Sequence, residues 1–134
     1  MITFKYKKEK VGVLGETTLR PVARIYLSTD KKSWYRFEPY IDSGADITLL
    51  SKSTGDLIGL KLEKEKPFNL GGISDGIPIV YKKIWMRLGK KEFEVKVAWA
   101  QVHGIPPLLG RTTVFENFNI TFKQKQGIIE FQEI

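Results

Sequence analysis

The segment that most constrains the fold reads Pro39-Tyr40-Ile41-Asp42-Ser43-Gly44-Ala45-Asp46-Ile47-Thr48-Leu49-Leu50. An apolar run enters this segment, small and acidic residues interrupt it, and a second apolar run leaves it. Gly44 permits a tight backbone turn, so we expect Asp42 at the end of a buried strand. An ordinary loop, in which Asp42 and Ser43 make local turn hydrogen bonds, is the simpler explanation of the bare tetrapeptide. The flanking sequence must therefore decide between a loop and an active site.

Length and composition indicate one globular domain. The chain has 134 residues, of which 42% are apolar and 28% charged, and these values are ordinary for soluble domains. The sequence contains no apolar run long enough for a transmembrane helix and no apolar stretch typical of a signal peptide. We expect a single cytoplasmic domain over residues 1–134, with 1–18 as an N-terminal strand region of unassigned role and no contact with a membrane.

Missing residue types exclude several kinds of site. The chain has no cysteine and one histidine, His103, which excludes thiolate metal sites and makes a histidine triad improbable. We therefore expect no metal and no cofactor. The net charge of +7 suggests a nucleic-acid partner, but the lysines alternate with glutamates in Lys61–Lys66 and Lys90–Glu94. This interleaving favours a mixed-charge surface over a nucleic-acid interface.

Strand patterns dominate the chain and predict a mainly β fold. Ile2, Phe4 and Tyr6 alternate with polar residues, which is the period of a half-buried strand. Further extended segments are expected at 22–27, 34–40, 84–88, 93–99, 120–122 and 128–131. Gly89-Lys90 predicts a hairpin turn between 84–88 and 93–99, and Lys125-Gln126-Gly127 predicts one between 120–122 and 128–131.

Helix signals are few and short. Ser51 is a candidate N-cap for a helix of one or two turns that ends near Ile58. Thr112 or Thr113 is a candidate cap for a second helix, because Glu116 follows Thr113 at the spacing of a capping box. We expect one or two short helices beside the strands.

Three motifs together resemble one protein family. An apolar residue, then Asp42-Ser43-Gly44-Ala45-Asp46, then Thr48-Leu49-Leu50 resembles the catalytic segment of retropepsin-like aspartic proteases, the family that includes the retroviral proteases. Gly71-Gly72-Ile73, within an expected hairpin, resembles the tip of that family's flap. Leu108-Leu109-Gly110-Arg111 resembles its second conserved motif, which precedes a short helix. Each motif is weak alone, and their order along the chain makes the resemblance specific.

The resemblance implies an architecture and an assembly. It covers about Leu19 to Phe131 and includes a closing hairpin like that of the cellular and prokaryotic members. It implies a closed β-barrel of the acid protease fold with one catalytic Asp motif per chain. Because aspartic proteases use two facing carboxylates that share a proton, it also implies a homodimer whose second Asp42 comes from a second copy. The expected reaction is hydrolysis of peptide bonds in an extended peptide or protein substrate.

The resemblance also implies roles for particular residues. Asp42 is the catalytic carboxylate, Ser43 and Gly44 support it, and Arg111 pairs with Asp46 and fixes the loop. The implied substrate-binding residues are Ala45, Asp46, Gly71, Gly72, Ile73, Pro106 and Leu108. Leu109 is expected in the core, because alternate strand residues face opposite sides. Arg111 could alternatively be an ordinary surface charge.

Two other functions stay open from the sequence. One is a retropepsin-like module that binds peptides or dimerises with little or no proteolysis. The other is a basic β-barrel that binds nucleic acid, which needs lysines and aromatic residues on one face. Trp34, Trp85 and Trp99 are expected in the core or in an interface rather than as base-stacking platforms.

Overall fold

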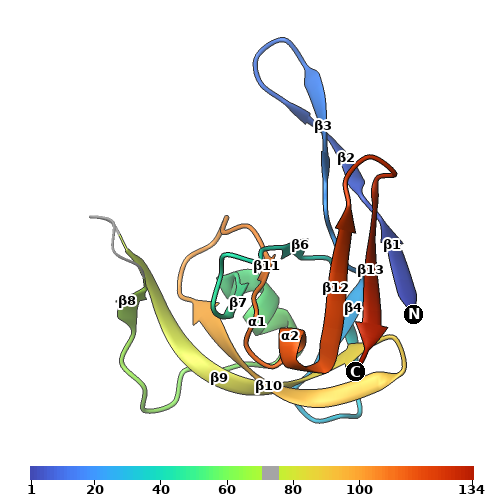
Figure 1. The fold of residues 1–134 in the computed structure, drawn as a ribbon. Coiled ribbons are helices and arrows are strands. Elements are labelled where there is room, and N and C mark those ends of the chain that lie inside the picture. Colours follow the sequence, from blue (N-terminus) through green and yellow to red (C-terminus); the bar gives the residue numbers. More distant parts are fainter. Residues whose placement is uncertain (71–75) are drawn as a thin grey trace.

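The computed structural model describes residues 1–70 and 76–134 and consists mainly of strands (Figure 1). In chain order its elements are β1 (Ile2–Lys5), β2 (Lys7–Val11), β3 (Glu16–Arg20), β4 (Ile25–Ser28), β5 (Tyr35–Phe37), β6 (Tyr40–Ile41), β7 (Thr48–Leu50), α1 (Lys52–Ile58), β8 (Phe68–Leu70), β9 (Ile77–Leu88), β10 (Lys91–Ala100), β11 (Leu108–Leu109), α2 (Val114–Asn117), β12 (Phe118–Lys123) and β13 (Ile128–Glu133). The mainly β fold with two short helices predicted from the sequence is confirmed.

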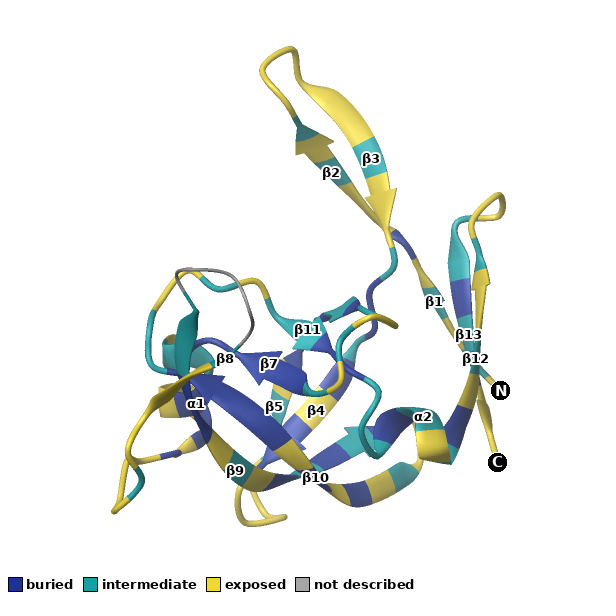
Figure 2. Cartoon of the chain, turned by 60° about the vertical axis from the view of Figure 1, so that its left-hand side comes forward, coloured by how far each residue is buried: buried dark blue, intermediate teal, exposed yellow. Residues whose placement is uncertain are grey.

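The β9–β10 hairpin forms the centre of the main sheet. Its two long strands pair antiparallel from Lys91 opposite Leu88 to Ala100 opposite Ile79, and the predicted turn at Gly89-Lys90 joins them. Residues of β10 alternate between exposed and buried until the last four positions, all of which are buried (Figure 2). This change shows that the second half of β10 is covered on both faces.

The main sheet curls into a half-barrel. Its strand order is β5-β4-β9-β10-β7-β11-β6, and β8 pairs with β9 beside this path. The last strand of this order, β6, lies beside the residues that precede β4. Two hydrogen bonds join them: Ile41 N–H donates to the Pro21 carbonyl at 2.9 Å, and Ala23 N–H donates to the Pro39 carbonyl at 3.1 Å. The isolated bridge between Val22 and Tyr40 lies within this contact. The pairings describe a curled half-barrel, and a fully closed barrel stays a prediction.

Both predicted helices form. The side chain of Ser51 accepts a hydrogen bond from Thr54 N–H and caps α1. The second helix begins after Thr113, whose N–H donates to the Glu116 carboxylate at 3.1 Å, as in the predicted capping box. Leu109 and Trp99 are fully buried, as expected.

The chain termini build a second, three-stranded sheet. Its order is β1-β13-β12, with Ile2 opposite Phe131, and the predicted C-terminal hairpin is confirmed. Phe131 packs against Phe4 and Phe118, with ring centroids 5.6 and 5.8 Å apart. Residues 7–20 form a separate hairpin of β2 and β3, which we call the arm; it projects away from the body (Figures 1 and 2).

Two kinds of feature are missing from residues 1–70 and 76–134. No helix among them is long and apolar enough to span a membrane. The same residues contain no cluster of histidine and acidic side chains that could hold a metal ion.

Candidate active site

Asp42 begins a tight loop directly after β6. Its N–H donates to the Leu109 carbonyl at 3.1 Å, which anchors the start of the loop to β11. Its side chain accepts a hydrogen bond from Gly44 N–H at 2.9 Å, and its carbonyl accepts one from Ala45 N–H at 3.1 Å. Asp42 is half-buried, whereas Ser43 and Gly44 are exposed. The local turn expected from the sequence is present, and it holds the carboxylate at the surface.

Arg111, which belongs to the motif Leu108-Leu109-Gly110-Arg111, holds this loop in place. One terminal nitrogen donates to the Ser43 carbonyl at 2.6 Å, and the other donates to the Asp46 carboxylate. Its backbone N–H donates to the Ala45 carbonyl at 3.0 Å. The predicted pair of Arg111 and Asp46 is confirmed. The side chain of Asp46 is 86% exposed, so the pair positions the loop more than it stabilises the fold.

Two threonines to which the sequence analysis gave no role in the site support the same loop. Thr48 is fully buried, and its hydroxyl oxygen accepts a hydrogen bond from Gly110 N–H at 3.1 Å. The hydroxyl of Thr112 donates to the Asp46 carbonyl at 2.6 Å. A Cβ at Gly110 would lie 2.4 Å from the backbone of Ile47, so the close approach of the two motifs requires glycine. In the sequence, the signal for Thr48 was a hydroxyl-bearing residue between two apolar neighbours, Ile47 and Leu49.

A cavity of about 460 Å³ opens beside Asp42. Tyr40 and Ile41 from β6 line one side of it, and Pro106 and Leu108 line another. Pro21 and two charged residues of the arm, Glu9 and Arg20, complete the wall. The structure thus brings the predicted residues Pro106 and Leu108 to the carboxylate. The arm residues are an addition that strand patterns could not reveal.

A second cavity, of about 250 Å³, lies on the other side of Leu108. Its lining includes the predicted residues Ala45 and Asp46 together with Ile47, Leu49 and Leu70. Leu108 lines both cavities and therefore separates two mainly apolar depressions next to the loop. The depressions suit apolar side chains of a ligand.

The predicted flap residues Gly71, Gly72 and Ile73 lie outside the described residues. The strands on either side of them are described. β8 pairs antiparallel with β9, and Leu70 lies opposite Ile77. The pairing of these flanking strands agrees with the expected hairpin.

A charged cluster joins the arm to the strand that precedes Asp42. The Tyr40 hydroxyl donates to the Glu9 carboxylate, which lowers the pKa of Glu9 and raises the pKa of Tyr40. Arg20 Nε lies 3.2 Å from the same carboxylate, and the Arg20 guanidinium lies 5.9 Å from the Tyr40 ring centroid. The arm is therefore attached at its base to the wall of the Asp42 cavity.

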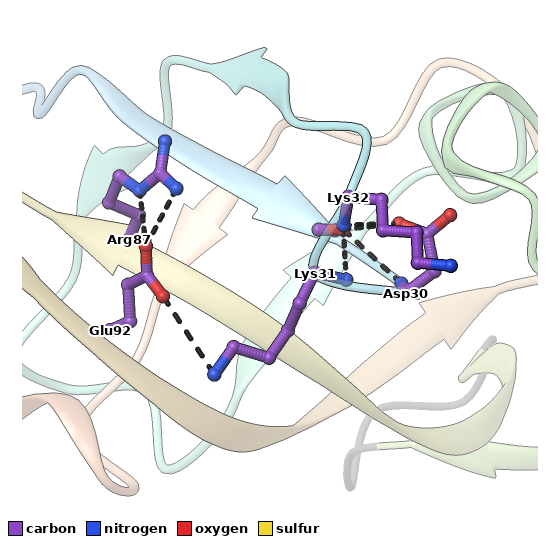
Figure 3. A network of polar contacts seen from close by, with 6 residues as sticks. Asp30, Lys31, Lys32, Arg87 and Glu92 are labelled. Atoms are coloured by element: carbon purple, nitrogen blue, oxygen red, sulfur yellow. Dashed lines mark hydrogen bonds and ion pairs between the residues drawn. The ribbon is translucent and has the colours of Figure 1, made fainter.

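A different polar network lies on β9, β10 and the loop after β4 (Figure 3). Glu92 pairs with Arg87 at 2.6 Å and with Lys31 at 3.9 Å. Trp34 and Trp85 are only half-buried, so they are not core residues. The cation of Arg87 lies 4.0 Å from the ring centroid of Trp34, and that of Lys31 lies 4.3 Å from the ring centroid of Trp85. One face of each indole is thus covered by a cation of the same chain.

Comparisons with known proteins identify the fold. No protein-family model matches the chain, and no curated protein matches its sequence. Among solved structures, a retropepsin-like aspartic protease from Rickettsia conorii superposes with a TM-score of 0.63 at 15% sequence identity, over 96% of this chain and 95% of that one. EIAV protease complexed with the inhibitor HBY-793 superposes with a TM-score of 0.55 at 15% identity, over 75% of this chain and 88% of that one. The resemblance noted in the sequence is therefore confirmed at the level of structure: this chain has the retropepsin-like fold.

Proposed function

We propose that this chain is one subunit of a homodimeric aspartic endopeptidase. One observation carries the proposal: Asp42 lies on an exposed loop clamped by Arg111, at the edge of a cavity large enough for a side chain of a peptide. The retropepsin-like fold supports it, because aspartic proteases with this fold are among the structural neighbours. Each chain carries one Asp-Ser-Gly segment, so the second carboxylate comes from a second copy on a two-fold axis.

The chemistry proposed for the dimer needs two carboxyl groups and one water. Two carboxylates held close together cannot both ionise easily, so the Asp42 pair shares one proton. The ionised member takes a proton from the water, whose oxygen attacks the carbonyl carbon of the peptide bond. The protonated member donates to the carbonyl oxygen, and a proton is later delivered to the departing amine nitrogen. Ser43 and Gly44 hold the two loops in place.

The proposed substrate is an extended peptide. Ala45 and Asp46 contact it from the loop, and Pro106 and Leu108 shape the apolar depressions on either side of Leu108. Gly71, Gly72 and Ile73 are proposed to cover it from the opposite side. Main-chain hydrogen bonds to the sheet would then bind the peptide as an added strand.

The two alternatives predict different results. A dimerising module without useful proteolysis would bind peptides and leave them intact. A nucleic-acid-binding barrel would bind oligonucleotides with an affinity that falls steeply with salt. The covered faces of Trp34 and Trp85 make this second alternative the less favoured one.

Replacing Asp42 by Asn tests the proposal. The substitution keeps the shape of the side chain and removes the base and the shared proton. We expect cleavage of a peptide library, measured by mass spectrometry, to fall to background while the circular dichroism spectrum is unchanged. Asp56→Asn, on the exposed face of α1, is the matched control and should cleave like the parent. Parent-like cleavage by the Asp42 variant would refute the assignment.

A further inference from the structure

The arm is a two-stranded sheet with no third strand. β2 and β3 pair antiparallel from Lys7 opposite Arg20 to Val11 opposite Glu16, and no other strand of the described chain joins them. All of their residues except Glu9, Val11 and Thr18 are exposed (Figure 2). An isolated hairpin of this size is marginally stable in water. The arm therefore has a surface that a further contact would stabilise.

The tip of the arm presents its most apolar residues to solvent. Val13 and Leu14 have relative exposures of 102% and 88%. They lie between Gly12 and Gly15, whose φ angles of 76° and 74° are in the left-handed region, where glycine carries no steric cost. Turns in contact with water usually carry polar residues. Here the two glycines form the turn and leave an apolar pair at its outermost point.

The position of the arm indicates what its tip can reach. At its base, Glu9 and Arg20 line the Asp42 cavity, and a Cβ on Gly127 would lie 3.6 Å from Leu19. In both views of the chain, the arm rises on the side of the body where β6 and β11 lie and extends well beyond them (Figures 1 and 2). A molecule that packs over the Asp42 loop would therefore lie within reach of the tip of the arm.

We propose that Val13 and Leu14 dock on the body of a second copy of this chain. The inference rests on the proposed function, because the second Asp42 must approach the exposed loop from the side toward which the arm extends. Two-fold symmetry makes the contact reciprocal, so each dimer contains two arm contacts. The strands of the arm carry mainly charged and polar residues, which suit solvent, and the apolar tip supplies the anchor. The arm thus adds an interface that lies apart from the paired Asp42 loops.

A charged tip tests the inference by weakening the dimer. The double variant Val13→Asp/Leu14→Asp should raise the dimer dissociation constant, measured by sedimentation equilibrium, by about tenfold or more, since two apolar side chains lose their burial. Thermal unfolding of the monomer should not change, because the exposed tip side chains make no core contact. Leu57→Asp is the matched control, because Leu57 is an exposed leucine on α1 (64%), and it should dimerise like the parent. An unchanged dissociation constant in the double variant would overturn the inference and leave the proposed function intact.

A label at the tip identifies what the arm contacts. The chain has no cysteine, so Val13→Cys can carry a single polarity-sensitive fluorophore. We expect its emission to shift to the blue as unlabelled protein is titrated in and the dimer forms. A dimer without this shift would refute the arm contact. A shift that occurs only when peptide is added would also refute it and would assign the arm to the substrate. A parent chain that stays monomeric at every concentration would remove both the arm contact and the dimeric enzyme.

Discussion

At the scale of single residues, Arg111 joins the two motifs of the site, because its guanidinium donates hydrogen bonds to two acceptors of one loop. It donates to the carbonyl of Ser43 and to the carboxylate of Asp46, which lie more than sixty positions earlier in the chain. A planar fork of donors suits this geometry, and a lysine could satisfy only part of it. Two residues of the loop that follows Asp42 are therefore held by one side chain from the second motif.

Thr48→Val should destabilise the protein through one hydrogen bond. Valine keeps the shape of threonine but leaves the buried N–H of Gly110 without the hydroxyl that accepts its bond. An unpaired buried donor costs about 1–3 kcal/mol, so the free energy of unfolding in urea should fall by about that amount. Thr121→Val is the control, since Thr121 is exposed on β12. Equal stabilities of the two variants would mean that the Thr48 hydroxyl does not support the loop.

The carboxyl group of Glu65 makes the stability of the fold depend on pH in the acidic range. Its hydrogen bond from Lys82 lowers its pKa from 4.5 to about 2. A carboxyl group with a lowered pKa stabilises the fold above its ordinary pKa, and this contribution is lost as pH falls toward the folded value. The Tm of the parent should therefore exceed that of Glu65→Gln at pH 6, and the difference should vanish between about pH 4.5 and 2. A constant difference across this range would refute the role of the pair; Glu94→Gln, on the exposed face of β10, is the control.

At the scale of elements, α1 packs against β10 through Gly55. A Cβ at this position would lie 1.9 Å from the indole nitrogen of Trp99, which donates to the Lys52 carbonyl at 3.3 Å. A glycine inside a helix costs about 1 kcal/mol relative to alanine. Here the close approach of the helix to a fully buried tryptophan explains why glycine is kept.

Gly55→Ala should therefore destabilise the protein although alanine favours helices. Overpacking a dense core costs about 1–3 kcal/mol, which exceeds the gain in helix propensity, so thermal unfolding should occur at a lower temperature. Leu57→Ala, on the exposed side of the same helix, should change the Tm little. A more stable Gly55→Ala variant would show that α1 can move away from β10 at little cost.

At the scale of the whole molecule, the proposed enzyme is active only as a dimer. Cleavage per chain should fall as the protein is diluted below its dimer dissociation constant, because each monomer has one Asp42. Sedimentation at micromolar concentration should give about twice 15.4 kDa. The two measurements should change together over the same concentration range. Constant cleavage per chain in a sample that sediments as a monomer would refute the shared active site.

Local patterns in the sequence were enough to predict much of the fold. The period-two alternation from Phe93 to Trp99, the turn at Gly89-Lys90 and the Ser51 cap each involve residues within one element or one turn. The Asp42 loop and its partner motif around Gly110 could be recognised for the same reason, since each is a short run of small, acidic and apolar residues. The pair of Arg111 and Asp46 followed from the resemblance of both runs to a known family.

The tertiary structure alone decided how these pieces meet. The hydrogen bond between Gly110 and Thr48 spans 62 positions, and it exists because β11 inserts between β6 and β7 in the sheet. Strand patterns predict which residues are extended but not which strands become neighbours, since the same alternation suits many sheet orders. For the same reason, residues 1–18 could be predicted to form strands, while the attachment of the arm beside Asp42 depended on long-range contacts of Glu9 and Arg20 with Tyr40.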